Sequence, residues 1–135
     1  MGSIIGLDTS IFIYLFEDHP TYRLKAQRLL NKVASGKSEA VFSVIGMIEL
    51  QTGPKKLGRP DLAVVYQELL TTFPHLEIIG LNEEIVDLTS DLRVKYGIAT
   101  PDAIHLATAI QSGAKRFVTN DKRLQKVKEI KVTLL

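Results

Sequence analysis

Hydrophobic and polar residues follow one another along this chain in blocks of two kinds. Short continuous apolar runs, rich in β-branched residues, are typical of strands buried on both faces of a parallel sheet. Between them lie longer segments whose apolar residues recur every three or four positions, as on one face of a helix. We predict strands over residues 3–7, 40–43, 76–79, 117–119 and 130–134. We predict helices over residues 10–16, 20–35, 44–52, 61–73, 83–95, 100 to the stop at Gly113, and 121–127, with a basic loop over residues 55–60.

The order of these elements predicts the fold class. Strands and helices alternate throughout, which favours an α/β fold with a central, mainly parallel sheet of about five strands and helices on both faces. The 135 residues contain no repeat, low-complexity segment or linker, so we predict a single domain over residues 1–135.

The ends of the helices are predicted from capping residues and helix breakers. Pro20 opens the second helix, and Gly53-Pro54 ends the third. Asn82 caps the fifth helix and Thr100 caps the sixth, where Pro101 occupies the first helical position.

The composition excludes several kinds of catalytic and metal site and indicates where in the cell the protein is expected. The absence of cysteine removes thiol catalysis, iron–sulfur ligation and cysteine-type zinc sites, and agrees with a reducing compartment. No apolar run approaches the roughly 20 residues that cross a bilayer, and no secretory signal is visible. We therefore expect a soluble cytoplasmic protein without a membrane partner. The formal net charge is only +2, but basic residues gather in the C-terminal quarter and at residues 55–59. They form either a solvated face or a phosphate-contacting surface.

Acidic residues occupy positions that an α/β fold brings together. Asp8 follows the first predicted strand, Asp121 follows the fourth, and Glu49 and Asp102 lie in the first turns of predicted helices. Ligands of open α/β sheets bind beyond the carboxyl ends of the strands, where these residues are expected. Clustered carboxylate oxygens bind hard divalent cations and support metal-assisted phosphoryl chemistry.

Four segments around these acids resemble, in order, the motifs of PIN-domain nucleases. They are Ile5-Gly6-Leu7-Asp8-Thr9-Ser10, Phe42 through Gly53, Thr100 through Ala109, and Val118-Thr119-Asn120-Asp121. Each motif alone is weak, but together they span nearly the whole chain at fitting spacings. The compact size is most similar to the VapC-type toxin ribonucleases of prokaryotic toxin–antitoxin pairs.

The resemblance implies an endoribonuclease that depends on Mg²⁺ or Mn²⁺, with RNA as substrate, an antitoxin protein as partner and a homodimeric assembly. It implies that the catalytic and metal-binding residues are Asp8, Glu49, Asp102 and Asp121, supported by the hydroxyl groups of Ser10 and Thr119. The sequence departs from the family where many relatives have an aromatic residue after the fourth acid, because Lys122-Arg123-Leu124 follows Asp121 here.

Other interpretations stay open at this stage. A PIN nuclease of RNA maturation or decay is hardly distinguishable from a toxin by sequence, and a catalytically silent PIN-like binding module is disfavoured because all four acids are present. A haloacid-dehalogenase-like phosphatase is disfavoured because Ser10 stands where a second aspartate is needed. His105 lies one turn after Asp102, and a packed or surface position is favoured over substrate contact or proton transfer. The apolar helix at residues 61–73 offers an antitoxin groove or belongs to the core.

Overall fold

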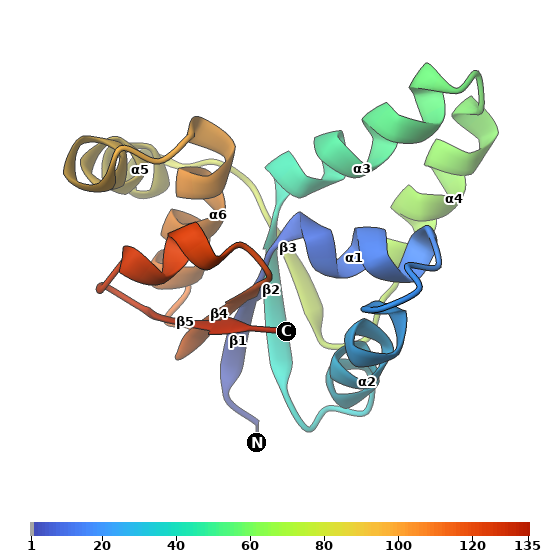
Figure 1. The fold of residues 1–135 in the computed structure, drawn as a ribbon, viewed down its shortest axis with the longest axis horizontal. Coiled ribbons are helices and arrows are strands. Elements are labelled where there is room, and N and C mark those ends of the chain that lie inside the picture. Colours follow the sequence, from blue (N-terminus) through green and yellow to red (C-terminus); the bar gives the residue numbers. More distant parts are fainter. Residues whose placement is uncertain (1) are drawn as a thin grey trace.

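A computed structural model describes residues 2–135 and has a 5-stranded, wholly parallel sheet with strand order β3-β2-β1-β4-β5 (Figure 1). The strands are β1 (Ile4–Leu7), β2 (Glu39–Ser43), β3 (Leu76–Ile79), β4 (Arg116–Thr119) and β5 (Lys131–Leu134). The helices are α1 (Thr9–Phe16), α2 (Arg23–Ala34), α3 (Val44–Lys56), α4 (Pro60–Thr71), α5 (Glu83–Tyr96) and α6 (Thr100–Gln111), with a 3₁₀ helix η1 (Lys122–Lys126). The predicted α/β class with a parallel five-stranded sheet is confirmed.

Helices cover both faces of the sheet, as predicted, and each face has its own hydrophobic core. In Figure 1, α1 and α2 lie on one side of the sheet, and α5 and α6 lie on the other. Ile5 and Leu7 of β1 point into the core that includes residues of α1, α2 and α3. Phe117 of β4 points into the core built with α5 and α6. Successive residues of a strand face opposite sides, so β4 contributes Val118 to the first core and Phe117 to the second.

Helix α6 is the most enclosed of the helices, because every residue from Ala103 to Ala109 is buried. It packs on β1 and β2 on one side and on α5 on the other. Its approach to β1 is so close that a Cβ atom added to Gly6 would lie 2.4 Å from the Cβ atom of Ala109. Gly6 is therefore the residue that lets α6 lie directly on the central strand.

The second helix begins later than predicted. Pro20 does not open it, because the backbone N–H groups of Thr21 and Tyr22 both donate to Nδ1 of His19 at 3.1 Å and residues 20–22 form a turn. Helix α2 starts only at Arg23. The histidine ring thus satisfies donors that a longer helix would have left without acceptors.

The third helix continues past its predicted end at Gly53-Pro54. Helix α3 runs through Pro54 to Lys56, so the predicted basic loop at residues 55–60 is reduced to residues 57–59. Pro54 is buried, and α3 packs along α4. This tertiary packing outweighs the roughly 3 kcal/mol that proline costs inside a helix.

Two further helix starts test the capping predictions. Asn82 caps α5 as predicted, and its side-chain oxygen accepts the N–H of Ile85 at 2.8 Å. Thr100 does not cap α6, because it is already the first helical residue and Ala99 occupies the cap position without a side-chain hydrogen bond. No helix within residues 2–135 is both long enough and apolar enough to span a bilayer.

Candidate functional site

The carboxyl ends of the parallel strands meet at one edge of the sheet, toward which β1 and β2 run upward in Figure 1. Asp8 directly follows β1, and Asp121 lies two residues after β4. Glu49 lies in the second turn of α3, which begins immediately after β2, and Asp102 lies in the first turn of α6. Helix α6 leads into β4 from the opposite edge, so its first turn returns to the edge where the strands end.

Thr119 joins Asp8 to the segment that carries Asp121. Its Oγ1 atom donates to Oδ2 of Asp8 at 2.5 Å and accepts the backbone N–H of Asp121 at 3.1 Å. Asp8 stands at the N-cap position of α1 but makes no side-chain capping hydrogen bond. Its carboxylate is therefore held toward β4, and Oδ1 accepts no hydrogen bond from any residue between 2 and 135.

Arg123 occupies both carboxylate oxygens of Asp121. Its Nε donates to Oδ1 at 3.0 Å, and its Nη2 donates to Oδ2 at 2.7 Å. This bidentate pair holds the pKa of Asp121 below its usual range. Asp121 also caps η1 by accepting the backbone N–H of Arg123. From the sequence, Lys122-Arg123-Leu124 was noted only because many relatives have an aromatic residue there. The contact between Arg123 and Asp121 was not predicted.

Glu49 is held by two side chains from other elements. Its Oε1 atom accepts from Oγ1 of Thr9 at 2.8 Å and from Nε2 of His105 at 2.8 Å, while Thr9 Oγ1 lies 3.0 Å from the same ring nitrogen. The hydrogen bond from His105 is the main reason that the pKa of Glu49 is lowered, and it outweighs partial burial of the carboxyl group.

His105 is packed, as the sequence interpretation favoured, and it also contacts the site. Only 3% of the residue is exposed, and its ring stacks on Phe42 at a centroid distance of 5.7 Å. Gly46 makes room for the Phe42 ring, because a Cβ atom at Gly46 would overlap the ring. Nδ1 of His105 is buried without a hydrogen-bond partner in residues 2–135, whereas Nε2 faces Glu49 and Thr9.

Asp102 experiences the charge of the other aspartates. Burial raises the pKa of Asp102 first, and the negative charges of Asp8 and Asp121 raise it further, against smaller opposing effects of His105 and Arg123. Asp8, Asp102 and Asp121 therefore converge, whereas Glu49 is connected to them through Thr9 and His105 rather than by its own charge.

The carboxylate oxygens of this site suit a hard divalent cation that needs only a few ligands from the protein. Within the described chain, no three acidic or histidine side chains stand close enough to enclose a metal ion by themselves. Mg²⁺ does not need such a cage, since it binds through one or two carboxylates and completes its shell with water and phosphate oxygens. The carboxylate of Asp102 is half-buried and its pKa is raised by burial and by the charge of Asp8, so a cation bound there would stabilise its ionised form.

Of the supporting residues expected from the resemblance, Thr119 makes the hydrogen bonds described above. Ser10 does not: its Oγ atom is buried and has no hydrogen-bond partner in the part of the chain that the structure describes. Its supporting role stays a prediction. Thr9, His105 and Arg123 contact the acids but were not assigned a role from the sequence. The position of His105 one turn after Asp102 was the signal that could have identified it.

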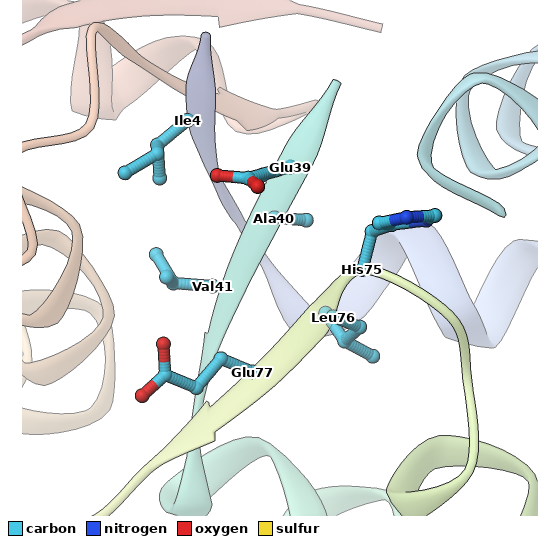
Figure 2. Close-up of a pocket in the computed structure, with 7 residues that line it drawn as sticks. All are labelled: Ile4, Glu39, Ala40, Val41, His75, Leu76 and Glu77. Atoms are coloured by element: carbon cyan, nitrogen blue, oxygen red, sulfur yellow. The ribbon is translucent and has the colours of Figure 1, made fainter. Parts of the chain in front are cut away.

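A separate hollow at the other edge of the sheet holds none of these residues (Figure 2). Ile4, Glu39 and Leu76 line it where their strands begin, with His75 beside them, and its volume is about 230 Å³. Ligands of parallel sheets bind beyond the carboxyl ends of the strands, so the acid group marks the candidate site and this hollow does not.

The fold and the site together define an α/β protein with a carboxylate group at the carboxyl edge of a parallel sheet. The model of the PIN domain matches residues 5–130, and the chain therefore belongs to the PIN domain family. Ribonuclease VapC6 from Methanocaldococcus jannaschii is 27% identical over 153 aligned positions, which cover 96% of this chain and 96% of that protein.

Several solved structures share the fold at low sequence identity. VapBC2 from Rickettsia felis, bound to a promoter DNA fragment, matches with a TM-score of 0.78 and 22% identity over 97% of this chain and 98% of that chain. DNA-bound VapBC from Salmonella typhimurium matches with a TM-score of 0.76 and 19% identity, over 99% of this chain and 98% of that chain. VapC20 from Mycobacterium tuberculosis, a toxin that cleaves the sarcin–ricin loop, matches with a TM-score of 0.73 and 15% identity, over 96% of this chain and 99% of that chain.

Proposed function

We propose that this protein is a divalent-metal-dependent endoribonuclease of the VapC type and the toxin of a toxin–antitoxin pair. The observation that carries the proposal is the position of Asp8, Asp102 and Asp121 at the carboxyl edge of a PIN fold, where burial and then the charges of Asp8 and Asp121 raise the pKa of Asp102. Similarity to a named ribonuclease over 96% of both chains supports hydrolysis of RNA phosphodiester bonds.

The proposed metal site uses Asp8, Asp102 and Asp121, with Glu49 beside them, and the ion is Mg²⁺ or Mn²⁺. A bound divalent cation supplies charge neutralisation at the phosphate and a water molecule of lowered pKa. The protein's own contribution is to fix the carboxylates in advance. Thr119 orients Asp8 through Oδ2, and Thr9 and His105 orient Glu49 through Oε1. Preorganised dipoles of this kind need no rearrangement during the reaction.

Glu49 is the residue that we assign to accept a proton during the reaction. Glu49 Oε2 accepts no hydrogen bond from residues 2–135, and the side chain is 40% exposed, so Oε2 is accessible to a water molecule or to the substrate. The hydrogen bond from Nε2 of His105 keeps Glu49 ionised at neutral pH. An ionised carboxylate with one free oxygen serves as an acceptor for a proton from the attacking water.

An apolar groove beside the site supports a protein partner. Ile13 and Phe16 of α1, Leu50 of α3 and Tyr66 of α4 line a hollow of about 300 Å³, and Glu49 lies at its margin. The helix at residues 60–71 contributes both to the core and to the surface, since Ala63 and Leu70 are buried whereas Val64, Val65 and Leu69 are exposed. An antitoxin seated here would lie against Glu49. Homodimerisation and a cytoplasmic location stay predictions, and sedimentation of the purified protein would measure the first.

The test is RNA cleavage by purified protein with Mg²⁺, with Mn²⁺ and with EDTA, beside Asp8→Asn and a matched control, Asp87→Asn. Asp87 is exposed on α5, so its variant removes one carboxylate charge without touching the site. We expect cleavage by wild type and Asp87→Asn only with metal, and none by Asp8→Asn. Metal-independent cleavage, or full activity of Asp8→Asn, would contradict the proposal.

A further inference from the structure

A second concave surface adjoins Asp102, and Glu49 does not line it. Its volume is about 340 Å³, at the low end of the range for ligand pockets. The last turns of α5 contribute Arg93, the connection to α6 contributes residues 97–99, and η1 contributes Arg123 and Lys126. Asp102 forms part of the same wall, so a ligand in this pocket would lie beside the proposed reaction site.

The pocket contains more positive charge than the described chain neutralises. Arg123 is paired with Asp121, but neither Arg93 nor Lys126 forms an ion pair with any residue between 2 and 135. The Nε of Arg93 donates to the carbonyl oxygen of Ile98 at 3.4 Å, and its terminal nitrogens donate to no residue in that range. Cations that line one hollow without carboxylate partners repel each other and gain from an anion.

The position of the charges selects the kind of anion. A phosphodiester is one link of a longer strand, so a nucleic acid bound here can continue past Asp102 toward the other carboxylates, which a small free anion cannot do. Guanidinium groups bind phosphate through paired, planar hydrogen bonds, and lysine binds it as a point charge. The charges of Arg123 and Lys126 also reach the acid group, since both contribute to the lowered pKa of Asp121.

We propose that the pocket lined by Arg93, Arg123 and Lys126 is a subsite that binds a backbone phosphate of the RNA next to the bond that is cut. This proposal rests on the proposed function, because it takes RNA as the substrate. Arg93 and Lys126 act as binding residues that hold the strand, and Asp102 separates their phosphate from the reacting one. Arg123 is shared, since it lines the pocket while it holds Asp121.

The experiment compares Arg93→Gln/Lys126→Gln with Arg28→Gln/Lys32→Gln. The control pair lies exposed on α2, against the opposite face of the sheet, and also loses one arginine and one lysine. Binding of a short single-stranded RNA is measured by fluorescence anisotropy in the Asp8→Asn background, over NaCl concentrations from about 50 to 200 mM. Melting curves of all variants verify that they are folded.

We expect the pocket variant to bind RNA roughly tenfold more weakly than the control pair, as for loss of hydrogen bonds to a charged group. The slope of log affinity against log salt should also become shallower by roughly 0.7 for one lost phosphate contact on a single strand. Inorganic phosphate should compete with RNA in the unmodified pocket and lose this effect in the pocket variant. Equal affinity and equal slope for the two pairs would overturn the subsite. Failure of the ribonuclease proposal is distinguishable, because it appears as metal-independent or Asp8-independent cleavage, whatever the binding comparison gives.

Discussion

The contact between Gly6 and α6 yields the most specific prediction, namely that Gly6→Ala destabilises the protein and slows RNA cleavage. A Cβ atom at Gly6 would lie 2.4 Å from Cβ of Ala109 and 3.1 Å from Cδ1 of Phe117. Carbon atoms pack at about 3.5–4.0 Å, so β1 and α6 must separate by about 1 Å. Helix α6 is buried along its length and has little room to move.

The expected cost follows from this lack of room. Overpacking a well-packed core costs about 1–3 kcal/mol, and an enclosed helix places the change in the upper half of that range. For a chain of this size that corresponds to a fall in Tm of roughly 6–15 °C. The same displacement moves Asp102, which α6 carries, relative to Asp8, which follows β1. A misplacement of about 1 Å can cost a hundredfold in rate, so we expect a loss of about tenfold to a hundredfold.

The assays are urea unfolding and metal-saturated RNA cleavage, with a compensating and a control variant. Ala109→Gly removes the clashing Cβ atom, so Gly6→Ala/Ala109→Gly should recover stability and activity, less about 1 kcal/mol for glycine inside a helix. Gly53→Ala should stabilise by about 0.5–1 kcal/mol, because its Cβ atom would meet nothing within 4 Å. A Gly6→Ala protein as stable as wild type, or no recovery in the double variant, would refute this account of the packing.

Two further predictions concern the carboxylates. Because the pKa of Asp102 is raised in the folded state, the native protein binds its proton more tightly than the unfolded chain, and wild-type stability falls as pH rises through the folded pKa. In EDTA at neutral pH, Asp102→Asn should therefore have a higher free energy of unfolding than wild type, and this difference should disappear in acid. An equal difference at all pH values would show that the charge of Asp102 is not its cause. His105→Leu should slow cleavage while changing the free energy of unfolding by only about 1 kcal/mol, since a buried, half-satisfied imidazole is replaced by an apolar group. His105→Gln, which keeps an N–H donor toward Glu49, should retain more activity, and equal rates for the two variants would exclude this positioning role.

Periodicity predicted the class of the fold because each strand and helix must bury an apolar face. The ends of the elements were less predictable, since they depend on partners far away in the sequence. Pro54 remains helical because α3 packs on α4, and α2 starts late because the ring of His19 takes up backbone donors. Local rules for proline contain neither contact.

In the site, too, the features set by local sequence were predictable, whereas contacts between residues far apart in the chain were not. The positions of the acids relative to the predicted strands sufficed to predict that they gather at the carboxyl edge, and Asp102 responds to the charges of Asp8 and Asp121. Their individual partners were not predictable, because a hydroxyl or imidazole that lies up to 111 positions away in the chain gives no periodic signal. The resemblance named Thr119 as a supporting hydroxyl but did not identify Asp8 as its acceptor, and the spacing of His105 from Asp102 pointed to a second partner.

These partners divide the carboxylates into two kinds. Asp8 and Glu49 each accept hydrogen bonds through one oxygen, so each keeps a second oxygen for a cation or the substrate. Asp121 differs, because both its oxygens are bound by the charged side chain of Arg123. Oδ2 of Asp121 accepts only one hydrogen bond and can still bind a cation, but that cation would repel the guanidinium of Arg123, which also lines the pocket beside Asp102. Metal binding at Asp121 and phosphate binding by Arg123 would then favour each other, since each removes a competitor of the other.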